Sequence, residues 1–277
     1  MKTESSDLIF DTQSNLFYRR WLTEKSQACL LLVHGLFAHS GRWQPLAEYF
    51  LNKGVSSYAL DLEGFGATKG RRGDIESFEV YFEQIRQLQK IIATCMQQLP
   101  TFLVGESFGG LLAYLFSYRY ARLFKGLICL SPAFSVKLQI SWWEYTRVFL
   151  HFFINPQRQF RLRLAGDMCT RDPEFQEQID NDILGHNFIS ARFVLNYFTA
   201  ERTARNSVFV IPIPVLFLIA GNDRIIDPHF SKIVFYRLVC EDKQMIKYPE
   251  MYHALSVEYG KEKVFEDIWQ WIKKHIN

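Results

Sequence analysis

The stretch "FLVGESFGGLLAYLFSYRY", residues 102–120, places a serine between two glycines at the point where an apolar run changes its periodicity. Residues 102–104 are typical of a buried strand, and apolar residues follow Ser107 at helical spacing. A strand that turns directly into a helix forces the junction residue to a positive φ, and nearby glycines leave room for the turn. The pattern G-x-S-x-G therefore predicts that Ser107 is a nucleophile exposed at a strand-to-helix turn.

Helix capping is the alternative role for Ser107. A serine that only caps a helix needs no glycine two residues before it and two residues after it, where Gly105 and Gly109 lie. The motif is short enough to arise by chance, so the nucleophile hypothesis depends on whether the rest of the chain supplies the partners that a nucleophile needs.

Length and composition fit one large α/β domain or two small ones. The chain has 277 residues, of which 48% are hydrophobic, enough for a sizeable core. The 32 basic and 29 acidic residues nearly balance, which argues against a nucleic-acid partner. The N-terminus lacks the apolar segment of a signal peptide, and no apolar run reaches the roughly 18 residues of a membrane span. We therefore expect a cytoplasmic protein, with peripheral contact at membranes as an additional hypothesis.

Continuous apolar runs alternate with amphipathic segments along most of the chain. Such runs are typical of parallel strands buried on both faces, and the segments between them carry apolar residues at helical spacing. Residues 7–12 and 15–23 predict an opening antiparallel hairpin. We expect an α/β fold with a mostly parallel sheet flanked by helices. The expected later strands lie at 28–35, 56–62, 101–107, 126–132, 214–221 and 244–250, and a last helix at 262–276.

Residues 133–206 lie between two expected core strands and are far longer than a normal connection. We therefore expect residues 1–132 and 207–277 to form the core and residues 133–206 to form an inserted helical cap, or lid. Most aromatic residues at the start of the insertion are expected to pack on the core. The alternative is that some line an acyl-chain tunnel or touch a lipid surface, with arginines facing headgroups. These residues are Trp142, Trp143, Tyr145, Phe149, Phe152, Phe153 and Phe160, with Arg147, Arg158, Arg161 and Arg163.

A nucleophilic serine needs a histidine base, and the histidine needs an acid to orient it. Asp223 follows one core strand and His253 follows the last strand, which gives the chain order Ser, Asp, His. Asp227 precedes a proline, as a helix N-cap does, and Glu250 lies too close to His253 in one loop to support it well. We expect Ser107, Asp223 and His253 to be the catalytic residues.

Two backbone N–H groups are expected to form an oxyanion hole, which stabilises the tetrahedral intermediate of acyl transfer. One belongs to Phe108, directly after the nucleophile, and the other belongs to Leu36, in the loop after an early strand. His34 ends that strand and precedes the serine in the chain. We interpret His34 as a residue that organises this loop rather than as the base.

The sequence carries no signal for a metal or a cofactor. Its seven histidines are dispersed, and neither C-x-x-C nor H-E-x-x-H occurs. The glycines of residues 61–73 are spaced G-x-G-x-x-x-G with no helix starting inside the segment, which argues against a phosphate-binding loop. We therefore expect no cofactor and no metal site.

Six segments in chain order resemble the monoacylglycerol lipase and lysophospholipase family of serine α/β-hydrolases. They are "HGLFAHSGRW" (34–43), "DLEGFGATKGRRG" (61–73), "GESFGG" (105–110), "CTRDPEFQEQIDNDILGHNFISAR" (169–192), "GNDRIID" (221–227) and "YHAL" (252–255). The resemblance implies the α/β-hydrolase fold, the same three catalytic residues, the two oxyanion donors and a cap that admits lipid. The chain departs from the family at Phe65, Thr68 and Phe108, where histidine, serine and methionine are usual.

These observations predict a serine carboxylic-ester hydrolase for single-chain lipid esters. Monoacylglycerol is the first candidate substrate, with a lysophospholipid or a short-chain ester as alternatives.

A non-catalytic protein that binds lipid or a partner on the same fold is the rival hypothesis, although a binding protein has no use for a complete triad. A dehalogenase or epoxide hydrolase would carry aspartate in place of Ser107. A net charge of +3 permits weak attraction to anionic lipid. Transient membrane contact through the cap is therefore an additional hypothesis.

Overall fold

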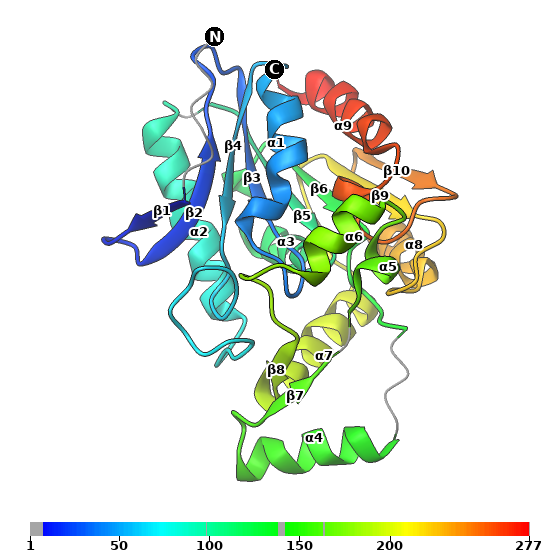
Figure 1. Ribbon diagram of the computed structural model, residues 1–277. Helices are drawn as coiled ribbons and strands as arrows, with labels where there is room; N and C mark the ends of the chain where they lie inside the picture. The colour runs from blue at the N-terminus through cyan, green and yellow to red at the C-terminus, as the bar shows by residue number, and fades with distance from the viewer. Residues whose placement is uncertain (1–7, 98, 138–141, 163, 277) are drawn as a thin grey trace.

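The computed structural model describes residues 8–97, 99–137, 142–162 and 164–276, which form an eight-stranded sheet flanked by helices (Figure 1). The strand order is β1-β2-β4-β3-β5-β6-β9-β10. All neighbours from β4 to β10 are parallel, and β1 and β2 form an antiparallel hairpin at one edge. The strands are β1 Leu8–Asp11, β2 Leu16–Trp21, β3 Ala28–Val33, β4 Val55–Leu60, β5 Thr101–Glu106, β6 Gly126–Leu130, β9 Val215–Ala220 and β10 Lys243–Tyr248.

The central strands are buried on both faces, which explains their continuous apolar sequences. Alternate residues of β3 belong to different core clusters: Leu30 and Leu32 pack with α1 and α9, and Leu31 and Val33 pack with the helices of the opposite face. The flanking helices are α1 Gln44–Leu51, α2 Glu79–Cys95, α3 Phe108–Tyr120, α8 Pro228–Arg237 and α9 Lys261–His275, with short 3₁₀ turns η1 Ser40–Trp43, η2 Ala121–Leu123 and η3 Leu255–Val257. The predicted α/β class, mostly parallel sheet and opening hairpin are confirmed.

Between β6 and β9 the chain leaves the sheet. In Figure 1, α4 lies farthest from the sheet, and α7 lies between α4 and the sheet. Two short antiparallel strands, β7 and β8, were not predicted, because three-residue strands show no clear periodicity. Residues 138–141 and Arg163 of the expected cap, and residues 1–7 of the expected core, lie outside the described residues. The elements here are α4 Trp142–Ile154, β7 Gln159–Arg161, α5 Gly166–Cys169, α6 Pro173–Asp180, β8 Phe188–Ser190 and α7 Ala191–Asn206.

The aromatic residues of α4 are mostly exposed, so the expectation that they pack on the core is wrong. Trp142 and Trp143 are 70% and 74% exposed, and Phe149 and Phe153 are exposed as well. Val148 of the same helix is buried in the core cluster. A helix that packs through one stripe leaves residues on its other faces in solvent. The side chain of Tyr145 is outside the described part of the chain.

Phe160, which lies in β7, does pack against the core as expected. Arg147, Arg158 and Arg161 are exposed. Within the described ranges, every helix falls short of the length and apolar content that a membrane crossing requires.

Candidate active site

Ser107 lies at the turn between β5 and α3 with a φ of 57°. The turn is so tight that a Cβ on Gly105 would lie 2.2 Å from the carbonyl oxygen of Gly109. A Cβ on Gly109 would lie 2.1 Å from the carbonyl oxygen of Val33. Glycine is therefore needed on both sides of the serine, and the predicted strand-to-helix turn is present.

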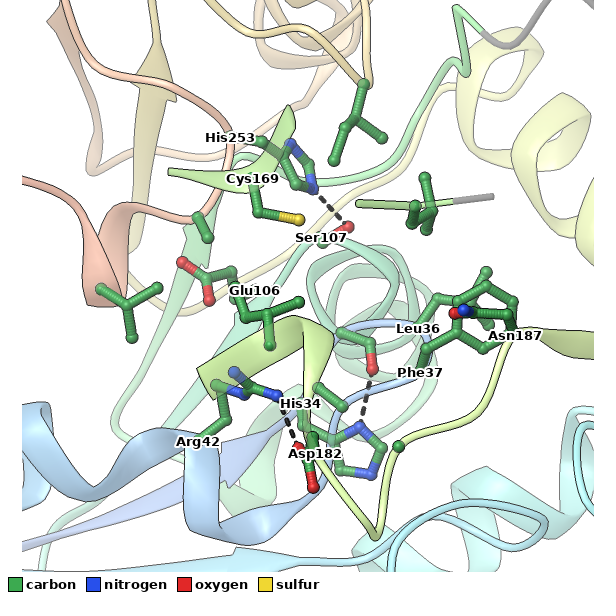
Figure 2. Close-up of a pocket in the computed structure, with 18 of the residues that line it drawn as sticks. His34, Leu36, Phe37, Arg42, Glu106, Ser107, Cys169, Asp182, Asn187 and His253 are labelled. Carbon is green, nitrogen blue, oxygen red and sulfur yellow. Dashed lines mark hydrogen bonds and ion pairs between the residues drawn. The ribbon is translucent and has the colours of Figure 1, made fainter. Parts of the chain in front are cut away.

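Ser107, His253 and Asp223 form a continuous chain of hydrogen bonds. His253 Nε2 lies 2.7 Å from Ser107 Oγ, as the dashed line in Figure 2 marks, and His253 Nδ1 lies 2.7 Å from Asp223 Oδ2. The other oxygen of Asp223 accepts the N–H groups of Ile225 and Ile226, which fixes the carboxylate. An ionised Asp223 only accepts hydrogen bonds, so Nδ1 carries the hydrogen and Nε2 can accept the proton of the serine hydroxyl.

The electrostatic surroundings of His253 suit a general base. Burial disfavours the charged imidazolium, but the Asp223 carboxylate opposes this effect through its charge and its hydrogen bond. The charge of Glu106 acts in the same direction, so the pKa of His253 lies above its ordinary value. A histidine with a raised pKa takes a proton from a hydroxyl more readily.

Asp227 and Glu250, the two alternatives to Asp223 as the acid that orients His253, have different surroundings. Asp227 caps α8 by accepting the N–H of His229, which confirms its predicted role as an N-cap. Glu250 is exposed, whereas Asp223 is buried beside His253. Among the described residues, no group of three or more His, Cys, Asp or Glu side chains has an arrangement that could hold a metal ion.

The two expected oxyanion donors, Leu36 and Phe108, line one cavity together with Ser107. Within the described residues, neither of their backbone N–H groups donates to a protein acceptor. Gly35 brings the Leu36 loop close to the nucleophile, since a Cβ on Gly35 would lie 3.3 Å from Ser107 Cβ. His34 bonds to the backbone of this loop and not to Ser107. The two N–H groups are thus available to a ligand beside the serine.

Ser107 opens onto two cavities of different character. One has a volume of about 210 Å³ and the other about 290 Å³, and Leu36, Leu164 and Ile225 line both. The first is rich in polar residues, among them Arg42, Glu106, Asp180, Asp182, His186 and Asn187. The second is mainly apolar, with walls that include Phe108, Leu162, Ile189, Phe193, Val194 and Tyr197. A molecule with an apolar part and a polar part can therefore place one part in each cavity, with the serine hydroxyl between them.

Of the residues that depart from the family, Phe108 lines the apolar cavity, and Phe65 packs against a residue that lines the polar one. Phe108 packs against Phe193 of α7, with ring centroids 5.5 Å apart. Phe65 stacks on His186, with ring centroids 5.1 Å apart. The larger apolar side chains thus join the core to the segments that follow β6, close to the nucleophile.

The loop of His253 is anchored by residues that the sequence did not indicate. The N–H of Ala254 donates to the carbonyl oxygen of Cys169 at 2.8 Å. The buried Glu258 accepts the N–H groups of Tyr252 and Arg171. These contacts join the loop of His253 to α5 and to the turn after it, far away in the chain. Cys169 and Arg171 belong to a segment that resembles the family, but nothing in that segment indicates which part of the chain it contacts.

Comparison with known proteins shows the family to which this chain belongs. A family model described as "Serine aminopeptidase, S33" matches residues 24–260, a range that includes Ser107, Asp223 and His253. The chain belongs to this family. It is 24% identical to the monoacylglycerol lipase of Mycolicibacterium smegmatis over 94% of both chains. It is 27% identical to phospholipase YtpA of Bacillus subtilis, covering 89% of this chain and 95% of that protein.

The whole chain is 26% identical to an uncharacterized abhydrolase domain-containing protein of Dictyostelium discoideum, but spans 30% of its length. Among solved structures, the monoacylglycerol lipase of Paleococcus ferrophilus gives a TM-score of 0.83 at 26% identity, covering 94% of this chain and 99% of that one. A soluble variant of Saccharomyces cerevisiae monoglyceride lipase gives 0.86 at 19% identity, covering 99% and 97%, which shows the common fold. The predicted family resemblance and the α/β-hydrolase fold are confirmed.

Proposed function

We propose that the protein is a serine hydrolase of carboxylic esters that acts on single-chain lipids, with monoacylglycerol as its substrate. The hydrogen-bonded chain of Asp223, His253 and Ser107, which opens onto an apolar and a polar cavity, carries the proposal. The apolar cavity suits an acyl chain, and the polar cavity suits the alcohol part of an ester. The names of the Mycolicibacterium and Paleococcus relatives support the same substrate class.

In this mechanism, Ser107 Oγ attacks the ester carbonyl while His253 Nε2 takes the hydroxyl proton. Asp223 keeps Nδ1 protonated and stabilises the imidazolium that forms. The N–H groups of Leu36 and Phe108 receive the oxyanion of the tetrahedral intermediate. His253 then gives its proton to the leaving alcohol. A water molecule, deprotonated by the same histidine, hydrolyses the acyl-enzyme and restores Ser107.

The charge of the polar cavity favours a neutral alcohol over a phosphate headgroup. Glu106, Asp180 and Asp182 line it together with Arg42, whose guanidinium is already paired with Asp182 at 2.6 Å. An anionic phosphate would therefore meet more negative than positive charge, whereas glycerol hydroxyls can donate to the carboxylates. On this argument lysophospholipids are the weaker candidates, and short-chain esters would leave the apolar cavity partly unused.

We further propose that residues 133–206 act as a cap and that α4 meets a lipid surface. Trp142 and Trp143 are exposed near the start of α4, and Phe149, Phe153 and Ile154 are exposed farther along it. Exposed aromatic and aliphatic side chains on a helix bind the interface of a bilayer, and the exposed Arg147 can face headgroups. A single-chain lipid could then pass from the membrane to the apolar cavity.

Fatty-acid release by the purified protein and its Ser107→Ala variant tests the function. We expect release from monoacylglycerol that exceeds release from lysophosphatidylcholine of the same chain length, and a loss of about 10⁴-fold or more in kcat for the variant. An amino-acid p-nitroanilide, the kind of amide an aminopeptidase cleaves, should be a poor substrate. Serine-independent release would overturn the mechanism, and a preference for the phospholipid would replace monoacylglycerol with lysophospholipid.

A further inference from the structure

Glu106 is a buried carboxylate beside the nucleophile that the mechanism above does not use. It is the last residue of β5 and is 7% exposed. Figure 2 shows it between Cys169 and Arg42 at the wall of the polar cavity. Burying an acid is costly unless hydrogen bonds or charges compensate, so its contacts indicate what it does.

Ser256 donates to both oxygens of Glu106. Its backbone N–H lies 2.9 Å from Oε1, and its hydroxyl oxygen lies 2.6 Å from Oε2. Ser256 is in η3, three residues after His253 and on the same loop. These two hydrogen bonds therefore tie the end of the nucleophile's strand to the loop that carries the base.

Two donors from Ser256 stabilise the carboxylate form of Glu106. Burial raises the pKa of Glu106, and although the hydrogen bonds from Ser256 and the charges of His253 and Arg42 lower it, the pKa stays above its ordinary value. The negative charge of Glu106 also acts on His253, in the same direction as Asp223 does.

Titratable groups from other elements also surround Glu106 and His253. Asp223 faces His253 from the loop after β9, and Arg42 faces Glu106 from η1. Cys169 of α5 lines the same cavity, but burial raises the pKa of its thiol to about 12, so it adds no charge. Asp180 lines the same cavity, and its charge acts on Cys169.

We propose that Glu106 is a positioning residue for the hydrolysis proposed above: it fixes the loop of His253 against β5 and stabilises the imidazolium formed when His253 takes the proton of Ser107. The inference rests on the proposed function. Asp223 orients the imidazole through Nδ1, while Glu106 acts on the loop through Ser256. The base is thus supported from two strands, β9 and β5.

The test compares the pH dependence of kcat/KM for a soluble p-nitrophenyl ester in the wild type, Glu106→Gln and Ser256→Ala. Removing the charge of Glu106 destabilises the imidazolium, so the acid limb of the Glu106→Gln profile should move to lower pH. The plateau value of kcat/KM should fall about tenfold. This corresponds to the lower end of the free energy that a hydrogen bond to a charged group contributes. Ser256→Ala keeps the charge, so we expect a smaller fall in the plateau and an acid limb close to that of the wild type.

Asp74→Asn is the matched control, because Asp74 is also a buried carboxylate but pairs with Arg192 rather than with the loop of His253. Its acid limb should coincide with that of the wild type.

An unmoved acid limb in Glu106→Gln overturns the proposal, whatever happens to the plateau. If Glu106→Gln does not fold, Glu106→Asp replaces it: the shorter side chain withdraws from Ser256, and a plateau equal to that of the wild type overturns the proposal. Absence of Ser107-dependent hydrolysis in the wild type would instead refute the proposed function itself.

Discussion

His34 donates from Nδ1 to the carbonyl oxygen of Gly35, 2.7 Å away, and so orients the peptide that precedes Leu36. The N–H of Leu62 donates to His34 Nε2 at 3.0 Å, which requires Nδ1 to carry the hydrogen. Burial lowers the pKa of His34 to about 4, so the ring stays neutral and keeps this tautomer at neutral pH. In a trans peptide the C=O and the following N–H point in opposite directions, so the Leu36 N–H is turned away from His34.

His34→Ala should therefore reduce kcat with little effect on KM. The peptide before Leu36 loses its anchor, and an oxyanion donor that is free to rotate stabilises the transition state less well. Loss of a complete donor costs about 10²–10³-fold in kcat, so we expect a fall of about 10- to 100-fold. Steady-state kinetics on a soluble ester measure it.

His275→Ala is a suitable control, because His275 also contacts a backbone carbonyl, that of Trp271, but lies in α9 away from the cavities. It should retain the activity of the wild type. A rise in KM at constant kcat in His34→Ala would argue against the role of His34 in the oxyanion loop.

The activity should depend on a deprotonated His253. Burial lowers and Asp223 raises the pKa of this histidine, and the net shift is upward. A base must be neutral to accept a proton, so kcat/KM should fall as the pH drops through a midpoint above the ordinary imidazole value of about 6.5. Asp223→Asn removes the charge and favours the wrong tautomer, so kcat should fall by about 10⁴-fold. A midpoint below the ordinary value in the wild type would contradict this account.

The sequence predicts the position of Ser107, Asp223 and His253 well because each follows a strand whose apolar run is easy to recognise. Parallel strands end at the same edge of a sheet, so residues that follow different strands meet there. The exposure of Trp142 was not predictable in the same way, because spacing along a helix does not reveal which faces have neighbours. The bond from Ser256 to Glu106 was also missed, since it joins residues 150 positions apart that share no motif.

Gly109→Ala should destabilise the fold around the nucleophile. Its Cβ would lie 2.1 Å from the carbonyl oxygen of Val33 and 2.6 Å from that of His34, and rigid backbone cannot move aside easily. Forcing extra atoms into a packed site typically costs about 1–3 kcal/mol, so Tm should fall by several degrees. Thermal unfolding followed by circular dichroism measures the change. A Tm equal to that of the wild type would mean that α3 can shift freely relative to β3.

Replacing both tryptophans at the start of α4 should separate membrane binding from chemistry. Trp142→Ser/Trp143→Ser removes two large exposed side chains, so binding to phosphatidylcholine vesicles should weaken by about tenfold or more. Hydrolysis of monoacylglycerol held in such vesicles should fall with it, while kcat/KM for a soluble ester stays at the wild-type value, because neither residue lines the cavities at Ser107.

Tyr236→Ser is the control, since Tyr236 of α8 is as exposed as Trp143, at 74%. Equal vesicle binding by the double variant and the wild type would show that α4 is not the surface that meets the lipid, and an equal loss in Tyr236→Ser would show that binding follows exposed aromatic area rather than α4.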